Sequence, residues 1–190
     1  MTEPKRRVYF ATENRNKYIE AARIAAAFGI IMKHLNLQKK EIQSRKLTEI
    51  ALFAAKQAAE STRKSIVVED AGFFVRGLGG FPGPYSSYVF GTLGWEGILK
   101  LLHSVRNREA SFEAVVAYCE PSQRPICFTG SVNGAVTRRA KGSNGFGFDP
   151  IFAPRGNRRT FAEMSTDEKN LYSHRAKAFT KFCKWFASSL

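Results

Sequence analysis

The sequence predicts an α/β fold, and three observations lead to this class. Near the N-terminus, an apolar run that suits a buried strand, Val8–Ala11, is followed by two segments with helical spacing and then by a second such run, Ser65–Val68. Strand, helix, helix and strand in this order are typical of the opening of an α/β domain. The chain has 190 residues and is 44% hydrophobic, which is enough to bury a core in one compact domain or in two closely packed lobes.

The first strand leads directly into a helix. Val8–Ala11 runs into the polar turn Thr12–Lys17, and an Ala-rich segment, Ile19–Phe28, follows and ends at Gly29, a typical C-cap residue. A second helix is predicted from apolar residues that keep helical spacing for about three turns. The series is Leu47, Ile50, Ala51, Ala54, Ala55, Ala58 and Ala59, and its alanines are small enough to pack closely on a sheet.

The middle of the chain adds a strand, a loop and a helix. The second strand, Ser65–Val68, is predicted to stop at two adjacent carboxylates, Glu69 and Asp70. Gly77–Pro84 is too rich in Gly and Pro for a regular element and is predicted to be a loop. Trp95–Val105 restores the helical spacing of apolar residues.

The C-terminal half predicts a hairpin, a loop and a helix. Ser111–Cys119 and Ile126–Val136 are β-rich and are separated by the turn residues Glu120–Gln123, so an antiparallel hairpin is expected. A second Gly-rich loop, Lys141–Pro150, precedes the short apolar run Ile151–Ala153, and residues 166–190 have a helical pattern. The order of the strands in the sheet does not follow from these patterns.

The net charge of +14 allows two function classes, a nucleic-acid binder or an enzyme whose positive field gathers polyanionic small molecules. Lys and Arg are scattered along the chain, and no segment interleaves them with aromatic residues as nucleic-acid-binding modules do. Specific nucleic-acid binding is therefore not the expected function, although a merely basic surface is compatible with either class.

The composition predicts a soluble, cytoplasmic protein. The longest apolar stretches, such as Ile24–Met32, span around ten residues, so neither a membrane segment nor a secretion signal is expected. Cys119, Cys127 and Cys183 are odd in number and widely separated, which predicts core thiols and neither a disulfide framework nor a zinc site.

The polar turn Thr12–Lys17 is a candidate phosphate site. At a strand-to-helix junction the first backbone N–H groups of the helix lack helical partners and attract an anion. Thr12 and Asn14 add short donors, and Arg15 and Lys17 add positive charge. A solvated helix cap with a few basic residues would give the same pattern. The turn lacks the glycines of a Walker loop or a dinucleotide fingerprint.

Glu69 and Asp70 are candidate metal ligands or bases. Neighbouring side chains of a regular strand point to opposite faces, so one carboxylate is expected to face the core and the other a cleft. If the first turn binds phosphates, the cleft carboxylate can hold Mg²⁺ or accept a proton from an attacking water. An acidic turn pair after a strand is the alternative. Glu41 is a possible further ligand.

The C-terminal helical pattern aims charged groups inward. At about 100° per residue, His174 and Arg175 fall in the middle of the apolar face that is formed by Leu171, Ala178, Phe182 and Trp185. A buried Arg needs an acceptor, which is either a protein carboxylate or a ligand. Lys169 would lie about 160° from this face, so a shared role requires the helix to begin later, with Ser173 as N-cap in place of Ser165.

The loop Gly145–Asp149 combines glycines with aromatic residues. Its small residues let the backbone approach a ligand, and Phe146 and Phe148 offer stacking surfaces for a planar base. Asp149 can accept hydrogen bonds from ring or exocyclic N–H groups of such a base. A packed turn is the alternative for this loop.

Taken together, these segments resemble the inosine triphosphate pyrophosphatase family, the non-canonical purine nucleoside triphosphate pyrophosphatases, over nearly the whole chain. Several motifs in the right order and spacing are more specific than any one of them. The motifs are Thr12-x-Asn14-x-x-Lys17, Glu69-Asp70-Ala71-Gly72, Leu78–Ser86, Gly142–Phe152, and Ala162–Met164 continuing through Lys169-Asn170 to Ser173-His174-Arg175.

The resemblance implies a single α/β domain over residues 1–190 with two lobes, a central elongated mixed β-sheet flanked by helices, and an active-site cleft between the lobes. It implies a Mg²⁺-dependent cytoplasmic homodimer that hydrolyses ITP, dITP or XTP to the monophosphate and pyrophosphate. Such an enzyme removes deaminated purines from the nucleotide pool.

Site residues are carried over by position. Asp70 is expected to be a metal ligand and the general base, with Glu41 as a second metal ligand and Lys17 as a catalytic cation. The triphosphate is expected at Thr12, Glu13, Asn14, Arg15, Asn16 and Lys17, with Ala71 also contacting the substrate. The base is expected at Phe146, Gly147, Phe148 and Asp149, in a pocket completed by Lys169, His174 and Arg175.

The donors of His174 and Arg175 would favour a 6-oxo purine over adenine, because a buried donor left unmet is penalised. Two positions depart from the family pattern: Glu13 replaces a common Gly and puts an acid beside the expected phosphates, and Ala71 replaces a Ser or Thr hydroxyl. Two alternatives stay open, namely a septum-formation-type pyrophosphatase acting on modified pyrimidines and a basic nucleic-acid-binding protein with a vestigial site.

Overall fold

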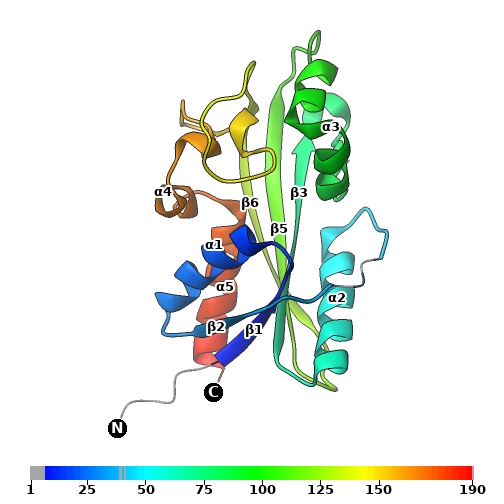
Figure 1. Ribbon diagram of the computed structural model, residues 1–190, viewed down its shortest axis with the longest axis vertical. Coiled ribbons are helices and arrows are strands. Elements are labelled where there is room, and N and C mark those ends of the chain that lie inside the picture. The colour runs from blue at the N-terminus through cyan, green and yellow to red at the C-terminus, as the bar shows by residue number, and fades with distance from the viewer. Residues whose placement is uncertain (1–6, 39, 41, 190) are drawn as a thin grey trace. The chain divides into compact units, whose positions relative to one another are not determined.

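The computed structural model describes residues 7–38, 40 and 42–189. Its strands are β1 Arg7–Ala11, β2 Ile31–Leu35, β3 Ile66–Val75, β4 Pro82–Gly83, β5 Glu109–Cys119, β6 Ile126–Val136 and β7 Phe152–Pro154. They form one sheet in the order β2-β1-β3-β5-β6-β7, and β4 pairs with β3 (Figure 1). Parallel and antiparallel pairs both occur, so the sheet is mixed and the predicted α/β class is confirmed.

Among the described residues, five helices and three short 3₁₀ turns join these strands. No helix in the described ranges is long and apolar enough to cross a membrane. The helices are α1 Arg15–Ala26, α2 Leu47–Thr62, α3 Ser86–Leu101, α4 Thr166–Asn170 and α5 His174–Ser188, and the 3₁₀ turns are η1 Arg76–Leu78, η2 Asp149–Ile151 and η3 Phe161–Glu163.

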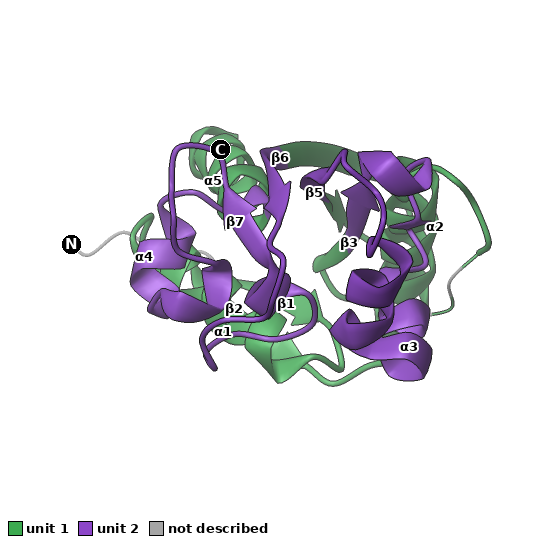
Figure 2. Cartoon of the chain, turned by 90° about the horizontal axis from the view of Figure 1, so that it is seen from above, with its two compact units in different colours: residues 1–70, 114–130, 175–190 green, residues 71–113, 131–174 purple. Residues whose placement is uncertain are grey.

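The chain divides into two compact units (Figure 2). Unit 1 consists of residues 1–70, 114–130 and 175–190, and unit 2 consists of residues 71–113 and 131–174. The strands β3, β5 and β6 contribute residues to both units.

In unit 1, β1 is central to a parallel arrangement. It pairs in parallel with β2 and β3, and Phe10 lies opposite both His34 and Val67. The helices α2 and α5 lie on opposite sides of β1 (Figure 1), and Phe10 packs edge-on against Phe179 of α5 with 5.2 Å between ring centroids. Because β1 and β3 run in the same direction, the turn after β1 emerges beside Glu69 of β3.

The core of unit 2 contains a cluster of phenylalanine rings. Phe73 of β3 packs against Phe112 of β5 at 4.6 Å, against Phe148 at 5.1 Å and against Phe152 at 5.9 Å between ring centroids. Such clusters stabilise the fold through the large apolar area of each ring and through offset or edge-on ring contacts.

The N-terminal elements differ from the prediction in three ways. The helix α1 begins at Arg15, four residues before the expected Ile19, because the side chain of Asn14 caps it. The strand β2 was not predicted, since its short run with polar Lys33 and His34 follows directly on the apolar end of α1. The strand β3 does not stop at its two carboxylates but continues to Val75, where it pairs with β4.

The remaining elements are shifted or divided. The helix α3 begins at Ser86 and not at Trp95, and Gly94, with a φ of +64°, interrupts its helical geometry just before the predicted start. The predicted loop Gly77–Pro84 contains most of η1 and the whole of β4. The C-terminal helical pattern forms two helices, α4 and α5, and not one. The strand β6 has the predicted bounds Ile126–Val136.

Candidate active site

The turn between β1 and α1 is closed by its own side chains. Asn14 is the N-cap of α1, and its Oδ1 accepts hydrogen bonds from the backbone N–H groups of Asn16 at 3.0 Å and Lys17 at 3.1 Å. Thr12 Oγ1 accepts from the N–H of Asn14 at 3.1 Å. The N–H groups of Asn16 and Lys17 therefore lack helical partners, as expected, but the cap side chain occupies both of them. In these contacts the oxygens of Thr12 and Asn14 accept, although they were expected to donate.

A second strand fixes the same turn from outside. Thr12 is buried, and its carbonyl oxygen lies 2.8 Å from Nε2 of His34 on β2, which fits an Nε2–H donor. The His34 ring stacks on Tyr18 with 4.6 Å between centroids, and the Tyr18 hydroxyl donates to the carbonyl of Met32 at 3.2 Å. His34 and Tyr18 were not among the predicted site residues, because the strand that carries His34 was itself not predicted.

The side chains of the turn differ in exposure. Glu13, Arg15 and Asn16 are exposed, and Lys17 is partly buried with 19% of its side chain accessible. The Lys17 ammonium lies 2.8 Å from Oε2 of Glu69 on β3. Lys17 is thus directed from α1 toward the sheet, where it contacts Glu69 of β3.

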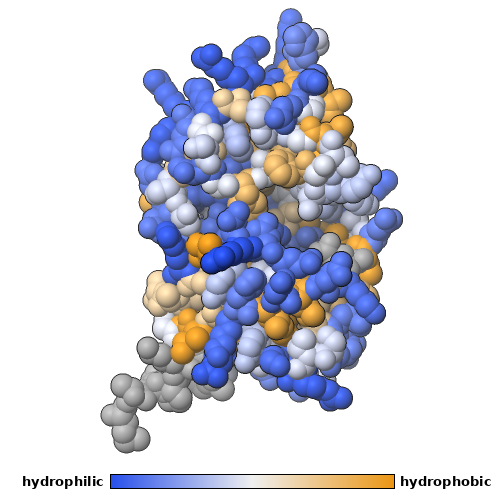
Figure 3. Space-filling model, viewed as in Figure 1, coloured by the Kyte–Doolittle hydropathy of each residue, from blue (hydrophilic) through white to orange (hydrophobic). Residues whose placement is uncertain are grey.

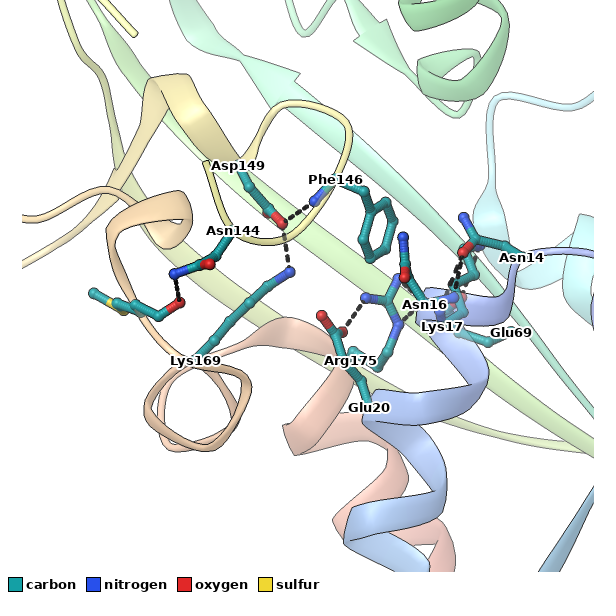
Figure 4. A network of polar contacts seen from close by, with 11 residues as sticks. Asn14, Asn16, Lys17, Glu20, Glu69, Asn144, Phe146, Asp149, Lys169 and Arg175 are labelled. Carbon is teal, nitrogen blue, oxygen red and sulfur yellow. Dashed lines mark hydrogen bonds and ion pairs between the residues drawn. The ribbon is translucent and has the colours of Figure 1, made fainter. Parts of the chain in front are cut away.

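Glu69 connects Lys17 to Arg175 (Figure 4). Its Oε1 accepts from Nε of Arg175 at 3.2 Å and from Nη2 at 3.0 Å, while Nη1 of Arg175 donates to Oε2 of Glu20 at 2.6 Å. Arg175, Glu69 and Glu20 are all buried. The buried Arg predicted for the C-terminal helix therefore has protein carboxylates as acceptors, which is the salt-bridge alternative. Glu20 was not predicted, although it follows Lys17 by three residues and so faces the same side of α1.

Asp70 follows Glu69 on β3 and is half-buried. Since strand side chains alternate, Asp70 points to the sheet face opposite Glu69. Glu69 is buried, as expected for the carboxylate that faces the core, and the expected position of Asp70 in a cleft stays a prediction. Glu41, the other expected metal ligand, lies outside the described residues. Within the described ranges, no group of three or more His, Cys, Asp or Glu side chains is arranged to hold a metal ion.

In unit 2, the loop Gly145–Asp149 forms a second polar cluster (Figure 4). Asp149 is buried, and its Oδ2 accepts from the N–H of Phe146 at 2.9 Å and from the ammonium of Lys169 at 2.6 Å. That ammonium also lies 4.9 Å from the centre of the Phe146 ring, within range of a cation–π interaction. The structure thus brings together three predicted base-binding residues, Phe146, Asp149 and Lys169.

The start of α5 explains how Lys169 turns inward. Ser165 caps α4 in a capping box with Glu168, and α5 begins separately at His174, directly after Ser173. Lys169 therefore lies before α5 and not on it. A shared role of Lys169 with His174 and Arg175 required the last helix to begin after Lys169, and this requirement is met. Leu171 was wrongly placed on the apolar face of α5: it is the C-cap residue of α4 and is 76% exposed.

Phe148 and His174 occupy apolar surroundings. Phe148 is buried between Phe73 and Phe90, at 5.1 and 5.6 Å between ring centroids, so the structure uses it as a core residue and the expectation that it stacks on a base is wrong. His174 is buried and stacks on Phe112 at 4.8 Å with an interplanar angle of 11°. Phe146, which is half-buried, is the aromatic residue of the loop that keeps an accessible face.

Ala71 and Gly147 differ in the space around them. Ala71 is half-buried on β3, next to Asp70. Gly147 has a φ of +63°, and a Cβ at this position would meet no atom within 4 Å. The glycine is therefore required here by the backbone conformation and not by packing.

The cysteines do not belong to these clusters. Cys119 and Cys183 are buried, as expected for core thiols, whereas Cys127 is half-buried. Burial raises the pKa of Cys183 to about 12, so its thiol is protonated at neutral pH and is a poor nucleophile.

Comparison with known proteins places the chain in a family. A relative from Methanopyrus kandleri, named dITP/XTP pyrophosphatase, is 48% identical over 184 residues, which cover 97% of this chain and 98% of the relative. A relative of the same name from Saccharolobus solfataricus is 47% identical over 177 residues, with 93% and 92% covered. The solved structure of a HAM1 protein from Coxiella burnetii has a TM-score of 0.83 at 27% identity and covers 95% of this chain and 98% of that one. The Ham1 family description matches residues 8–185, and this chain belongs to the Ham1 family.

Proposed function

We propose that this chain is a nucleoside triphosphate pyrophosphatase that hydrolyses the non-canonical purine nucleotides ITP, dITP and XTP to the monophosphate and pyrophosphate. Relatives that match nearly its whole length carry the name dITP/XTP pyrophosphatase. Within the chain, the observation that carries the proposal is the position of the Lys17 ammonium, which lies 2.8 Å from Glu69. The residue that follows Glu69 on β3 is the half-buried Asp70. Phosphoanhydride hydrolysis requires a cation that neutralises the charge of the phosphates and a base that accepts a proton from water.

Four residues of unit 1 have a part in the proposed reaction. Lys17 binds the triphosphate and neutralises the negative charge that develops as the bond between the α- and β-phosphates breaks. Asp70 accepts a proton from the attacking water, whose oxygen forms the new bond to phosphorus while pyrophosphate leaves. Asn14 and Thr12 keep the turn in one conformation through the hydrogen bonds of the cap.

Asp70 also fits a role as a ligand of Mg²⁺. This ion prefers oxygen ligands and is usually bound by one or two carboxylates together with substrate phosphates, and Asp70 offers a half-buried carboxylate on a rigid strand. Glu41 is proposed as the second carboxylate. Bound Mg²⁺ supplies further charge neutralisation and lowers the pKa of a coordinated water.

We assign recognition of the base to the cluster of Phe146, Asp149 and Lys169. Phe146 offers a ring face for stacking, and Lys169 offers an ammonium, which can only donate hydrogen bonds. The 6-oxo group of hypoxanthine and xanthine accepts a hydrogen bond, whereas the 6-amino group of adenine would leave a donor unmet, which is penalised in a buried site. Arg175 and His174 remain further proposed donors.

We also propose that the enzyme is a cytoplasmic homodimer. Figure 3 shows hydrophilic residues over most of the viewed face, with hydrophobic residues in separate patches. Exposed apolar side chains of the kind that interfaces cover gather on and beside α3, at Tyr85, Tyr88, Phe90, Leu93 and Leu101. Sedimentation analysis tests this proposal, and a monomer at micromolar concentration would contradict it.

A panel of nucleotides tests the function. Pyrophosphate release is measured with ITP, dITP, XTP, ATP, GTP, CTP and UTP, each with Mg²⁺ and with a chelator. We expect rapid Mg²⁺-dependent cleavage of the deaminated purines, while ATP is largely spared. Equal rates on the four ordinary nucleotides would exclude the proposed specificity, and preference for modified pyrimidines would favour the septum-formation type. Salt-sensitive binding of duplex DNA or RNA without hydrolysis would favour the nucleic-acid-binding alternative. The net charge of +14 is compatible with this alternative.

A further inference from the structure

We propose that Glu20 is a positioning residue of the phosphate turn. Its buried carboxylate holds Arg175, and Arg175 holds Glu69 in the orientation that binds the ammonium of Lys17. The inference rests on the proposed function, because it gives Glu20 a part in placing the catalytic cation. In this proposal Glu20 acts through two other side chains, those of Arg175 and Glu69.

The contacts form a loop that starts and ends on α1. Lys17 and Glu20 lie three residues apart on one face of the helix. From Lys17 the contacts pass to Glu69 on β3, then to Arg175 on α5, and return to α1 at Glu20 (Figure 4). The helix that carries Lys17 therefore carries both ends of the chain of contacts that orients it.

The orientation of Glu69 depends on which partner each of its two carboxylate oxygens contacts. Oε1 accepts both hydrogen bonds from Arg175, and Oε2 lies 2.8 Å from the ammonium of Lys17. A guanidinium prefers to bind a carboxylate through two parallel hydrogen bonds, one to each oxygen. Such a pairing would use Oε2 as well, and it would displace Lys17 from its place.

Glu20 opposes that pairing. Its Oε2 accepts from Nη1 of Arg175 at 2.6 Å, at the edge of the guanidinium away from Glu69. The side chains of Arg175 and Glu20 are only 2% and 6% exposed, so water screens their attraction weakly. If the Glu20 carboxylate is neutralised, its attraction for Nη1 of Arg175 is weakened, and the attraction of Glu69 for the guanidinium is no longer opposed. Arg175 is then expected to move toward both oxygens of Glu69, and Lys17 to turn toward solvent.

The variant Glu20→Gln tests the proposal, with Glu60→Gln as the matched control. Both variants remove one negative charge from a helix of unit 1, but Glu60 is exposed on α2. With ITP and Mg²⁺ we expect Glu20→Gln to lower kcat by about tenfold to a hundredfold and to change KM by less than about threefold, because displaced charge costs most in the transition state. Glu60→Gln should match the wild type. A kcat for Glu20→Gln within threefold of the control would overturn the inference.

Two further measurements keep the result interpretable. A crystal structure of Glu20→Gln should show Arg175 on both oxygens of Glu69 and the Lys17 ammonium out of contact with Glu69, and an unchanged contact would overturn the inference even if activity fell. If Glu20→Gln does not fold, Glu20→Asp keeps the charge, withdraws it from Arg175 and should lower kcat severalfold, while a wild-type kcat would overturn the inference. A wild-type protein that cleaves no nucleotide would instead overturn the proposed function, and the structural measurement would still test Glu20.

Discussion

Replacing Gly145 with alanine should break the cluster around Asp149. Gly145 has a φ of +74°, and a Cβ at this position would overlap Oδ2 of Asp149. That oxygen accepts the hydrogen bonds from Lys169 at 2.6 Å and from the N–H of Phe146 at 2.9 Å. The substitution therefore forces the carboxylate out of both contacts.

The cost follows from these contacts. An alanine in the left-handed region costs about 1 kcal/mol, and a hydrogen bond that involves a charged group contributes about 1.5–3 kcal/mol. With partial relaxation of Asp149, we expect Gly145→Ala to lower the free energy of unfolding by about 4 kcal/mol. At about 2–4 °C for each kcal/mol, Tm should fall by about 8–16 °C.

Gly79→Ala is the matched control. Gly79 has a φ of +64°, and an added Cβ would meet nothing within 4 Å. This variant carries the backbone strain without the overlap and should lose about 1 kcal/mol. Urea unfolding followed by circular dichroism, together with calorimetry, measures the difference. Equal losses in the two variants would refute the reasoning that Asp149 makes Gly145 necessary.

Three further predictions concern single side chains. Asp70→Asn should reduce turnover of ITP by at least about a thousandfold while Tm stays within a few degrees, and near-normal activity would reject Asp70 as the base. Lys169→Met leaves the carboxylate of Asp149 buried without its cation and should cost about 3–5 kcal/mol of unfolding free energy, so a loss below about 1 kcal/mol in urea unfolding would show that the pair is not tightly coupled. Burial raises the pKa of Cys183 to about 12, so its side chain stays a protonated thiol at pH 8. Mass spectrometry should find Cys183 unmodified by iodoacetamide in the folded protein and modified in urea. Rapid labelling of the folded protein would contradict the burial of this thiol.

The sequence predicts best those elements whose pattern is long and regular. The strand β6 has the predicted bounds, and α2 begins at the predicted Leu47, because each pattern runs for more than ten residues without interruption. Short elements were missed or mislocated. The strand β2 has only five residues and follows the Ala-rich end of α1. The helix α4 also has five residues, and its helical spacing continues into that of α5, so the sequence alone does not separate the two helices.

The candidate site shows the same limit. Lys17 and Asp149 stand out because their motifs are local, but their partners come from distant segments. Arg175 pairs with Glu20, which is 155 residues away in the chain, and no local pattern distinguishes Glu20 from the other acids. Phe148 was misassigned for a related reason: an aromatic side chain in a Gly-rich loop has the same sequence signature whether it faces a ligand or the core.

The shared position of Glu69 has a consequence for release of the product. Lys17 and Arg175 carry two positive charges against the negative charges of Glu69 and Glu20, so this group of four side chains has no net charge before a nucleotide binds. If Lys17 binds a phosphate as proposed, its ammonium has three N–H donors and can keep its contact with Glu69. Glu69 also keeps its contact with Arg175 and does not become an isolated buried charge, which would be costly. Under the proposed function, Glu69 would share this ammonium with pyrophosphate, which would weaken the contact with the product and favour its departure.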